Sequence, residues 1–175
     1  MKNTYGSVTP VRSKTIVSFR PLLQKNYGGP NDCTLTSITA LGSFKEKYAR
    51  PIKGVYLLVE KVAKNYFYSA EKFGTIPVFI KYIINKTFSV NSHSHYGKGV
   101  GFNWNTIKQN INNNVPMILS LWNDGRNYYT QHSIIIIGYR EYANAKMLAV
   151  YDNWYDSVSY VDYNKLSTIS CINYF

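Results

Sequence analysis

Two residues of this 175-residue chain have the chemistry and the setting of a nucleophile and its base. The first is Cys33, which follows the chain-breaking residues 28–32 (Gly-Gly-Pro-Asn-Asp) and opens a segment with helical periodicity. The free N–H groups and the positive dipole end of a helix N-terminus favour a thiolate and can stabilise an oxyanion. The alternative is a structural cysteine, because free cysteines are among the most buried residues.

The second is His132, which precedes the run of isoleucines at residues 134–137. This position is the start of a predicted buried strand, so we expect the ring to lie at the edge of the core. A thiolate nucleophile needs an imidazole that acts first as base and then as acid for the leaving amine. A histidine before a strand is more often structural, but its combination with Cys33 favours catalysis.

The imidazole also needs an orienting partner, and Asp152 and Asn153 follow the next predicted strand, residues 147–151. The 20 positions from His132 to Asp152 fit a strand, a tight connection and a returning antiparallel strand, which would place the two side by side. Asp152 would accept the ring N–H, hold the tautomer and stabilise the imidazolium. Turn formation is the alternative, since Asp-Asn after a strand is also typical of a turn.

These residues lie on elements of two kinds, helices first and strands afterwards. Apolar periodicity predicts four helices, at residues 33–48, 53–66, 76–88 and 105–113, and Asn31 or Asp32 can cap the first. Strands are predicted at residues 15–19, 115–122, 133–139, 147–151, 158–161 and 169–174. Residues 89–104 are predicted to form a loop, which could line a substrate cleft. Residues 123–127 are predicted to form a turn. This segregation predicts an α+β fold with an antiparallel sheet.

The length predicts a single domain over residues 1–175. Its helical half would cover about residues 20–114 and its sheet half about residues 115–175. We expect the active site to lie between the two halves.

The motifs resemble those of the papain-like cysteine peptidases. The resemblance rests on Cys33 at the start of a long helix, on the segment His132-Ser-Ile-Ile-Ile-Ile-Gly-Tyr139 and on a polar residue ahead of Trp154. Residues 116–120 (Pro-Met-Ile-Leu-Ser) also fit, and the resemblance covers about residues 24–155. Within the superfamily the chain looks most like the bacteriocin-leader-processing peptidases and their stand-alone bacterial relatives, and second most like the staphopain-type peptidases.

The resemblance implies a papain-like fold and a role for each motif residue. Cys33 would be the nucleophile, His132 the base, and Asp152 the residue that orients His132, with Asn153 as the alternative. No cofactor or metal is implied. The implied reaction is hydrolysis of an amide bond in a peptide or protein through an acyl-enzyme.

Gln24 would donate its side-chain amide to the oxyanion, together with the Cys33 N–H. The gap of nine residues from Gln24 to Cys33 is longer than usual in these families, so Asn31 and Asn26 are alternative donors. A second departure is that Thr34-Leu35-Thr36 follows Cys33 in place of Gly-Pro-Thr.

The charge of the chain suggests two further partners. Of the formal charge of +11, residues 1–120 hold 16 basic and 4 acidic side chains, against 4 and 5 in residues 121–175. A solvated basic surface is the favoured interpretation, and docking on an anionic cell-wall polymer is an alternative. An amidase or acyltransferase for peptidoglycan or isopeptide bonds would use the same residues. A non-catalytic basic module that binds nucleic acid is disfavoured, because the 17 tyrosines are scattered and no recognition motif occurs.

The remaining residues that could do chemistry are interpreted as structural. His93 and His95 would point to the same side of a strand, but no carboxylate or cysteine with ligand-like spacing accompanies them, so we predict no metal site. Cys171 is expected on a sheet face, unpaired with Cys33. Trp122 and Trp154 would either roof the site or belong to the core.

Hydropathy predicts no membrane span, because the isoleucine run at residues 134–137 is far too short. The first ten residues are polar and no apolar core follows them, so no secretory signal is predicted. We therefore expect a soluble chain, cytoplasmic as given and secreted if a signal has been removed.

Overall fold

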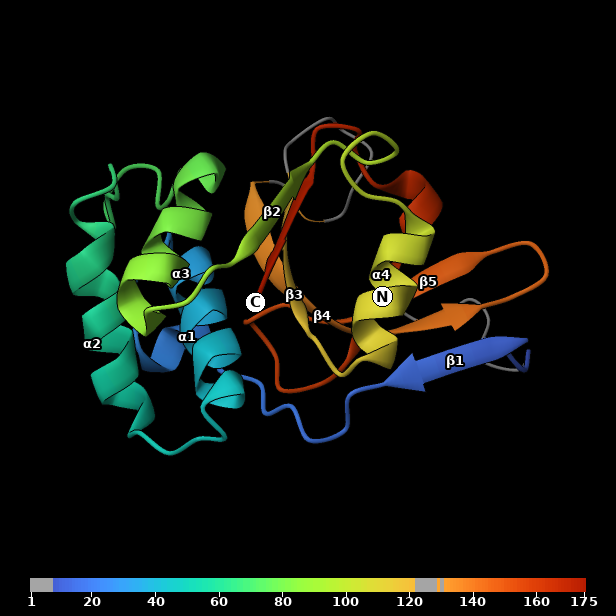
Figure 1. Ribbon diagram of the computed structural model, residues 1–175, viewed down its shortest axis with the longest axis horizontal. Coiled ribbons are helices and arrows are strands. Elements are labelled where there is room, and N and C mark those ends of the chain that lie inside the picture. Colours follow the sequence, from blue (N-terminus) through green and yellow to red (C-terminus); the bar gives the residue numbers. More distant parts are fainter. Residues whose placement is uncertain (1–7, 122–128, 130) are drawn as a thin grey trace.

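The computed structural model describes residues 8–121, 129 and 131–175 (Figure 1). Its helices are α1 (Cys33–Lys45), α2 (Ile52–Ala63), α3 (Ile80–Phe88) and α4 (Trp104–Asn112), with 3-10 turns η1 (Gln24–Asn26), η2 (Pro77–Phe79) and η3 (Tyr163–Lys165). Its strands are β1 (Arg12–Thr15), β2 (His93–Tyr96), β3 (Met117–Leu121), β4 (His132–Glu141), β5 (Lys146–Tyr151), β6 (Ser159–Asp162) and β7 (Cys171–Tyr174). These elements confirm the α+β prediction.

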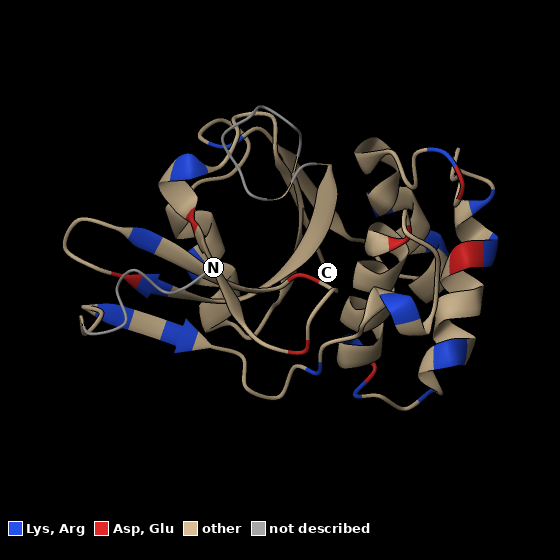
Figure 2. Cartoon of the chain, turned by 180° about the vertical axis from the view of Figure 1, so that it is seen from behind, with Lys and Arg blue, Asp and Glu red and all other residues tan. Residues whose placement is uncertain are grey.

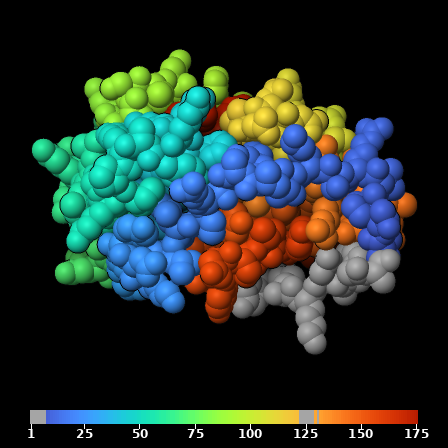
Figure 3. All heavy atoms as spheres, turned by 90° about the horizontal axis from the view of Figure 1, so that it is seen from below, coloured from blue at the N-terminus to red at the C-terminus, as the bar shows by residue number. Residues whose placement is uncertain are grey.

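The strands form one antiparallel sheet in the order β2-β7-β3-β4-β5-β6, with β1 paired to the far end of β4. Two of its strands, β1 and β2, come from the part of the chain before residue 115, so the sheet is not built from the C-terminal part alone. Between β1 and α1 the chain crosses from the sheet to the helices, along the blue band in Figure 3. Ile16, Phe19 and Leu22 anchor this crossing in the core.

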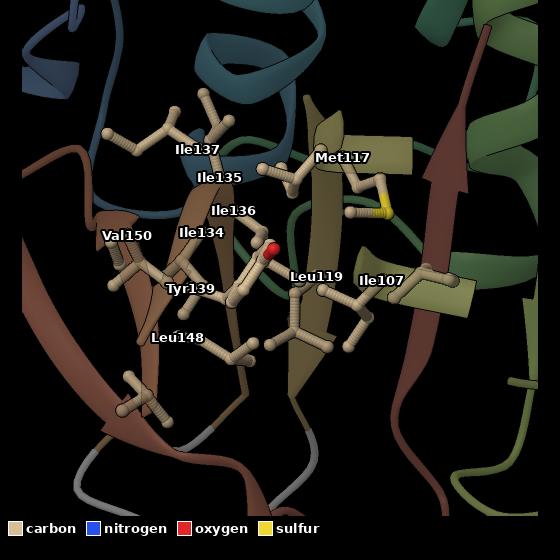
Figure 4. Close-up of a cluster of buried hydrophobic side chains, with 14 of the residues drawn as sticks. Ile107, Met117, Leu119, Ile134, Ile135, Ile136, Ile137, Tyr139, Leu148 and Val150 are labelled. Atoms are coloured by element: carbon tan, nitrogen blue, oxygen red, sulfur yellow. The ribbon is translucent and has the colours of Figure 1, made fainter. Parts of the chain in front are cut away.

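The sheet separates two apolar clusters, with α1, α2 and α3 on one side and α4 on the other (Figure 1). Successive residues of a strand point to opposite faces. Accordingly Ile118 belongs to the cluster of α1–α3, whereas its neighbours Met117 and Leu119 pack in the cluster that contains Ile107 of α4 (Figure 4).

Helix α1 is the central helix, since it contacts α2, α3 and the strands β3 and β4. The sequence predicts one apolar stripe on this helix, and its members Leu35, Ile38 and Leu41 are indeed buried. The helix is nevertheless buried all round, from Thr34 to Ser43. Its buried hydroxyl side chains are therefore available to bond neighbouring elements, which decides how the site is held.

Three predicted segments differ from the structure. The prediction of a strand at residues 15–19 is wrong, because the strand β1 lies at Arg12–Thr15. Every residue of β1 is exposed, so no apolar alternation marks it in the sequence. The loop at residues 89–104 contains β2, also without a burial pattern. The predicted helix at residues 76–88 is observed as η2 followed directly by α3, with Pro77 as the first residue of η2, where a missing N–H leaves no bond unmade. The predicted turn at residues 123–127 lies outside the described residues.

Lys and Arg positions are spread over helices and strands alike (Figure 2). Within the described ranges, no helix combines the length and the apolar character that crossing a membrane requires.

Candidate active site

Cys33 and His132 line the same cleft, which has a volume of about 560 Å³ and lies between the helices and the sheet. Cys33 is the first residue of α1 and is partly exposed. His132 is the first residue of β4, and its side chain is almost wholly buried. On the helical side the cleft continues over residues 72–77, and on the sheet side over Leu121 and Trp154.

The main chain of Asp152 determines the tautomer of His132. The Nε2 atom lies 2.7 Å from the carbonyl oxygen of Asp152. A carbonyl oxygen can only accept a hydrogen bond, so Nε2 carries the proton. In the neutral ring Nδ1 is then the unprotonated nitrogen, and it is the atom that can act as base.

The sequence predicts that the ring N–H of His132 is accepted by the Asp152 carboxylate, whereas the structure places the Asp152 main-chain oxygen there. Among the described residues the Asp152 carboxylate makes no hydrogen bond to His132: its Oδ2 accepts one from the Tyr129 hydroxyl at 3.0 Å, and its Oδ1 accepts those of the Trp154 and Tyr155 N–H groups at 3.0 Å each. Asp152 thus also forms the turn that was its alternative interpretation. Its charge still acts through space, because it opposes the effect of burial on the pKa of His132.

Burial raises the pKa of the Cys33 thiol, and the neighbouring Asp32 carboxylate adds to that effect. Hydrogen bonds from Ser133 and Thr34 act in the opposite direction without reversing it. Burial likewise lowers the pKa of His132. Both pKa shifts favour the uncharged form of the group, in contrast to the expected helix-stabilised thiolate, and within the described part of the chain no hydrogen bond joins Cys33 to His132.

Two aromatic rings fix the plane of the imidazole. Trp154 stacks on His132 with ring centroids 4.2 Å apart and planes at 23°. Tyr129 stacks on it at 5.6 Å and 28°. Trp154 is 43% exposed, so it roofs the ring rather than belonging to the core. Trp122, the other predicted roof residue, lies outside the described residues.

Asn153 joins the element of the nucleophile to the element of the base. Its Nδ2 donates to the carbonyl oxygens of Cys33 and Ser133, at 3.2 and 2.9 Å, and to the Ser37 hydroxyl at 2.8 Å. The residue has a φ of +65°, a conformation that asparagine adopts more readily than most residues. It makes no hydrogen bond to His132 among the described residues, so it does not fill the orienting role.

Among the described residues no hydrogen bond joins any of the three predicted amide donors to Cys33. The Nε2 of Gln24 donates to the Gly29 carbonyl at 2.6 Å, and Gln24 does not line the cleft. Asn31 lines the cleft, but its Nδ2 donates to the Ala70 carbonyl at 2.9 Å. Asn26 is exposed in η1. The N–H of Cys33 remains available, since the first N–H groups of a helix have no partner inside it.

The sequence analysis missed Asp32 and Tyr129. Asp32 occupies the N-cap position of α1, but its side chain makes no capping bond. It is 3% exposed and accepts three other hydrogen bonds. The only signal for it was a charged residue directly before a reactive one, and that pattern also fits a cap. Nothing in the sequence distinguishes Tyr129 from the other tyrosines.

The remaining candidates lie apart from the cleft. His93 and His95 stack on the ring of Tyr174, with centroids 5.2 and 5.7 Å apart. The described ranges contain no group of three His, Cys, Asp or Glu residues that could hold a metal ion. Cys171 is buried in β7, and both cysteines are free.

The family model described as Peptidase_C39 like family matches residues 16–171, which includes Gln24, Cys33, His132 and Asp152. No curated protein matches the chain.

Proposed function

Because the chain belongs to the Peptidase_C39 like family, we propose that it is a cysteine peptidase with Cys33 as nucleophile and His132 as base. One observation carries the assignment of roles. The hydrogen bond from Nε2 of His132 to the Asp152 carbonyl leaves Nδ1 as the basic atom, on a ring that lines the same cleft as Cys33. This arrangement supports general-base activation of the thiol.

The reaction begins with both groups uncharged. Nδ1 of His132 takes the thiol proton as the Cys33 sulfur attacks the carbonyl carbon of the peptide, and the N–H of Cys33 stabilises the oxyanion. The C–N bond then breaks, and the imidazolium gives its proton to the leaving amine. Water, deprotonated by the same Nδ1, hydrolyses the thioester, and the proton returns to the thiol as the acid leaves. Through both steps Nε2 keeps its hydrogen bond to Asp152, so the ring need not turn.

The lining of the cleft supports a peptide substrate with apolar side chains. Phe73, Ile76 and Pro77 form its helical wall. Among the described lining residues, Lys72 is the one basic side chain besides His132, and none is a carboxylate. An acidic substrate side chain could pair with Lys72, whereas the described lining offers a basic one no carboxylate. We further propose that residues 1–175 act as one domain, with this cleft between helices and sheet.

Replacement of each cysteine in turn tests the proposal. We expect Cys33→Ala to keep the fold and to lose turnover of casein or of a peptide library to the background rate. Cys171→Ala is the matched control, because it removes a thiol that does not line the cleft, and it should retain turnover. Retained turnover in Cys33→Ala, with circular dichroism spectra unchanged, would refute the role of Cys33.

A further inference from the structure

The proposed mechanism leaves a buried carboxylate next to the nucleophile without a role. Asp32 accepts the Gly29 N–H at 2.6 Å, the Tyr56 hydroxyl at 2.9 Å and the Tyr68 hydroxyl at 2.5 Å. Burial and this carboxylate raise the pKa of both phenols, so both stay protonated as donors. Burying a carboxylate is costly unless it is hydrogen-bonded, so the three donors are what makes this position possible.

The three donors belong to three different parts of the chain. Gly29 lies in the turn before Cys33, Tyr56 lies in α2, and Tyr68 opens residues 68–77. We name residues 68–77 the wall segment, because Lys72, Phe73, Thr75, Ile76 and Pro77 of the cleft lining all lie in it. Asp32, the residue directly before the nucleophile, is therefore bonded to one wall of the cleft through Tyr68.

Asn31 fastens the wall segment a second time. Its Nδ2 donates to the Ala70 carbonyl at 2.9 Å. Gly74 has a φ of +68°, and a Cβ at this position would lie 2.4 Å from the Asn31 carbonyl oxygen. The main chains of Ser69 and Gly74 exchange hydrogen bonds of 3.0 and 2.7 Å, which close the segment into a loop. The loop is thus seated directly on the two residues that precede Cys33.

The apolar core explains little of where the wall segment lies. Within the segment only Gly74 is buried, Phe73 is 57% and Ile76 37% exposed, and the partly buried ring of Tyr68 packs against the cluster of α1–α3. With few core contacts the position of a loop depends largely on its polar contacts. Among the described residues, the hydrogen bonds that leave the segment go to Asn31 and Asp32, apart from those that Phe79 and Ile80 donate to the carbonyls of Ile76 and Pro77 in and before η2.

We propose that Asp32 is a positioning residue for the substrate: through Tyr68 it holds the wall segment at a fixed place beside Cys33 and thereby sets how tightly the cleft binds a peptide. Asp32 itself lines no part of the cleft and takes no part in proton transfer. The inference rests on the proposed function. The inference goes beyond the proposed function because it assigns control of peptide affinity to Asp32, a carboxylate that touches neither the substrate nor His132.

Two alkylating reagents of different size test the inference on the full chain. Because Cys33 and the wall segment line one cleft, we expect an epoxysuccinyl peptide to reach the wall while its epoxide reacts with Cys33, whereas iodoacetamide is too small to do so. We expect Tyr68→Phe to raise the KI for inactivation by the epoxysuccinyl peptide about tenfold, with kinact changed less than about twofold, because a hydrogen bond that only places the wall contributes to binding alone. The rate with iodoacetamide should change less than about twofold, since the thiol is untouched.

Two further tyrosines provide the controls. Tyr56→Phe removes a hydroxyl from the same carboxylate but leaves the wall segment attached, so its KI should rise less than in Tyr68→Phe. Tyr139→Phe removes a hydroxyl that bonds Asn112 away from the cleft, and its KI should equal that of the wild type. Gly74→Ala places a methyl group against the Asn31 carbonyl and so displaces the wall segment by a second route. It should raise KI as Tyr68→Phe does. An unchanged KI in Tyr68→Phe, or an equal fall in the iodoacetamide rate, would overturn the inference.

Amide hydrogen exchange separates failure of this inference from failure of the proposed function. In Tyr68→Phe we expect exchange of residues 68–77 to accelerate at least about fivefold, and in Tyr56→Phe and Tyr139→Phe to stay unchanged. This readout does not depend on catalysis. If the wild type is not labelled by the epoxysuccinyl peptide, the proposed function is contradicted while the exchange result still decides the role of Tyr68. Exchange unaltered by Tyr68→Phe contradicts the positioning role.

Discussion

At the scale of single residues, the atom that meets an imidazole matters as much as the residue that supplies it. A carboxylate would both orient the ring and stabilise the imidazolium, whereas a carbonyl orients the ring and supplies only a dipole. His132 is held by the carbonyl of Asp152, while the carboxylate serves Tyr129 and the following turn. The charge of Asp152 therefore acts on His132 only through space.

Replacement of the Asp152 carboxylate should accordingly have only a small effect on turnover. We expect Asp152→Asn to lower kcat less than about tenfold, far from the roughly 10⁴-fold loss typical of a catalytic carboxylate that contacts its histidine. Removal of the negative charge destabilises the imidazolium, so the pKa of His132 falls and the acid limb of the pH profile of kcat/KM moves to lower pH. A loss above about 10³-fold with the fold intact would show that the carboxylate contacts the ring during turnover.

The pH dependence of alkylation tests the resting charge state. Because burial raises the pKa of Cys33 above the ordinary thiol value of 9.0, the reactive thiolate is scarce at neutral pH. The rate of labelling by iodoacetamide should thus keep rising above pH 9, measured by mass spectrometry. Cys171 is 1% exposed and serves as the slow internal reference. A rate that is constant between pH 6 and 9 would indicate a thiolate–imidazolium pair instead.

At the scale of elements, the site depends on the attachment of α1 to β4. Asn153 bonds the carbonyls at the start of both elements and the hydroxyl of Ser37. The hydroxyls of Thr34 and Ser133 add a bond of 2.8 Å between the same two elements. These bonds hold α1 and β4 in one relative position and so set the distance between Cys33 and His132. Apolar contacts alone have no direction and would hold the two elements less firmly.

Truncation of the Asn153 side chain should lower both the stability of the fold and the rate of catalysis. We expect Asn153→Ala to lower the free energy of unfolding by about 3 kcal/mol, because the two N–H groups shared among three acceptors are lost and the residue has a φ of +65°. Asn114→Ala is the matched control: it has a φ of +58° but is exposed, and it should cost about 1 kcal/mol. Urea denaturation measures both variants. Equal losses would mean that the backbone strain alone accounts for the effect.

At the scale of the whole molecule, α1 lies between the other helices and the sheet, so neither side is complete without it. The sheet also takes β1 and β2 from the part of the chain that precedes residue 115. The cleft lies where these two sides meet. Loss of either side would consequently remove one wall of the cleft.

Unfolding should therefore be a single event. We expect one cooperative transition on heating or in urea, with the same midpoint for two probes. Far-ultraviolet circular dichroism reports mainly the helices, and tryptophan fluorescence comes from three residues that include Trp104 and Trp154 on the sheet side. Two separated midpoints would show that helices and sheet are independent units and would contradict the proposal of one domain.

The sequence alone determined what can be read from local order. The helix start at Cys33, the buried strand after His132 and the position of Asp152 at the end of the next strand follow from chain breakers and apolar periodicity, which act over a few residues. The motif segments were also enough to indicate the family. The exposed strands β1 and β2 carried no such pattern, because their pairing with β4 and β7 uses main-chain atoms.

Only the tertiary structure decided which atoms meet. The use of the Asp152 carbonyl, the place of Asn153 between α1 and β4, and the bonds of Asp32 to Tyr56 and Tyr68 join residues from 20 to 120 positions apart. Burial, which sets the direction of the Cys33 and His132 pKa shifts, is likewise a property of the packed molecule. Local sequence specifies the type of a side chain and its element, whereas hydrogen-bond partners and desolvation depend on what the fold packs around it.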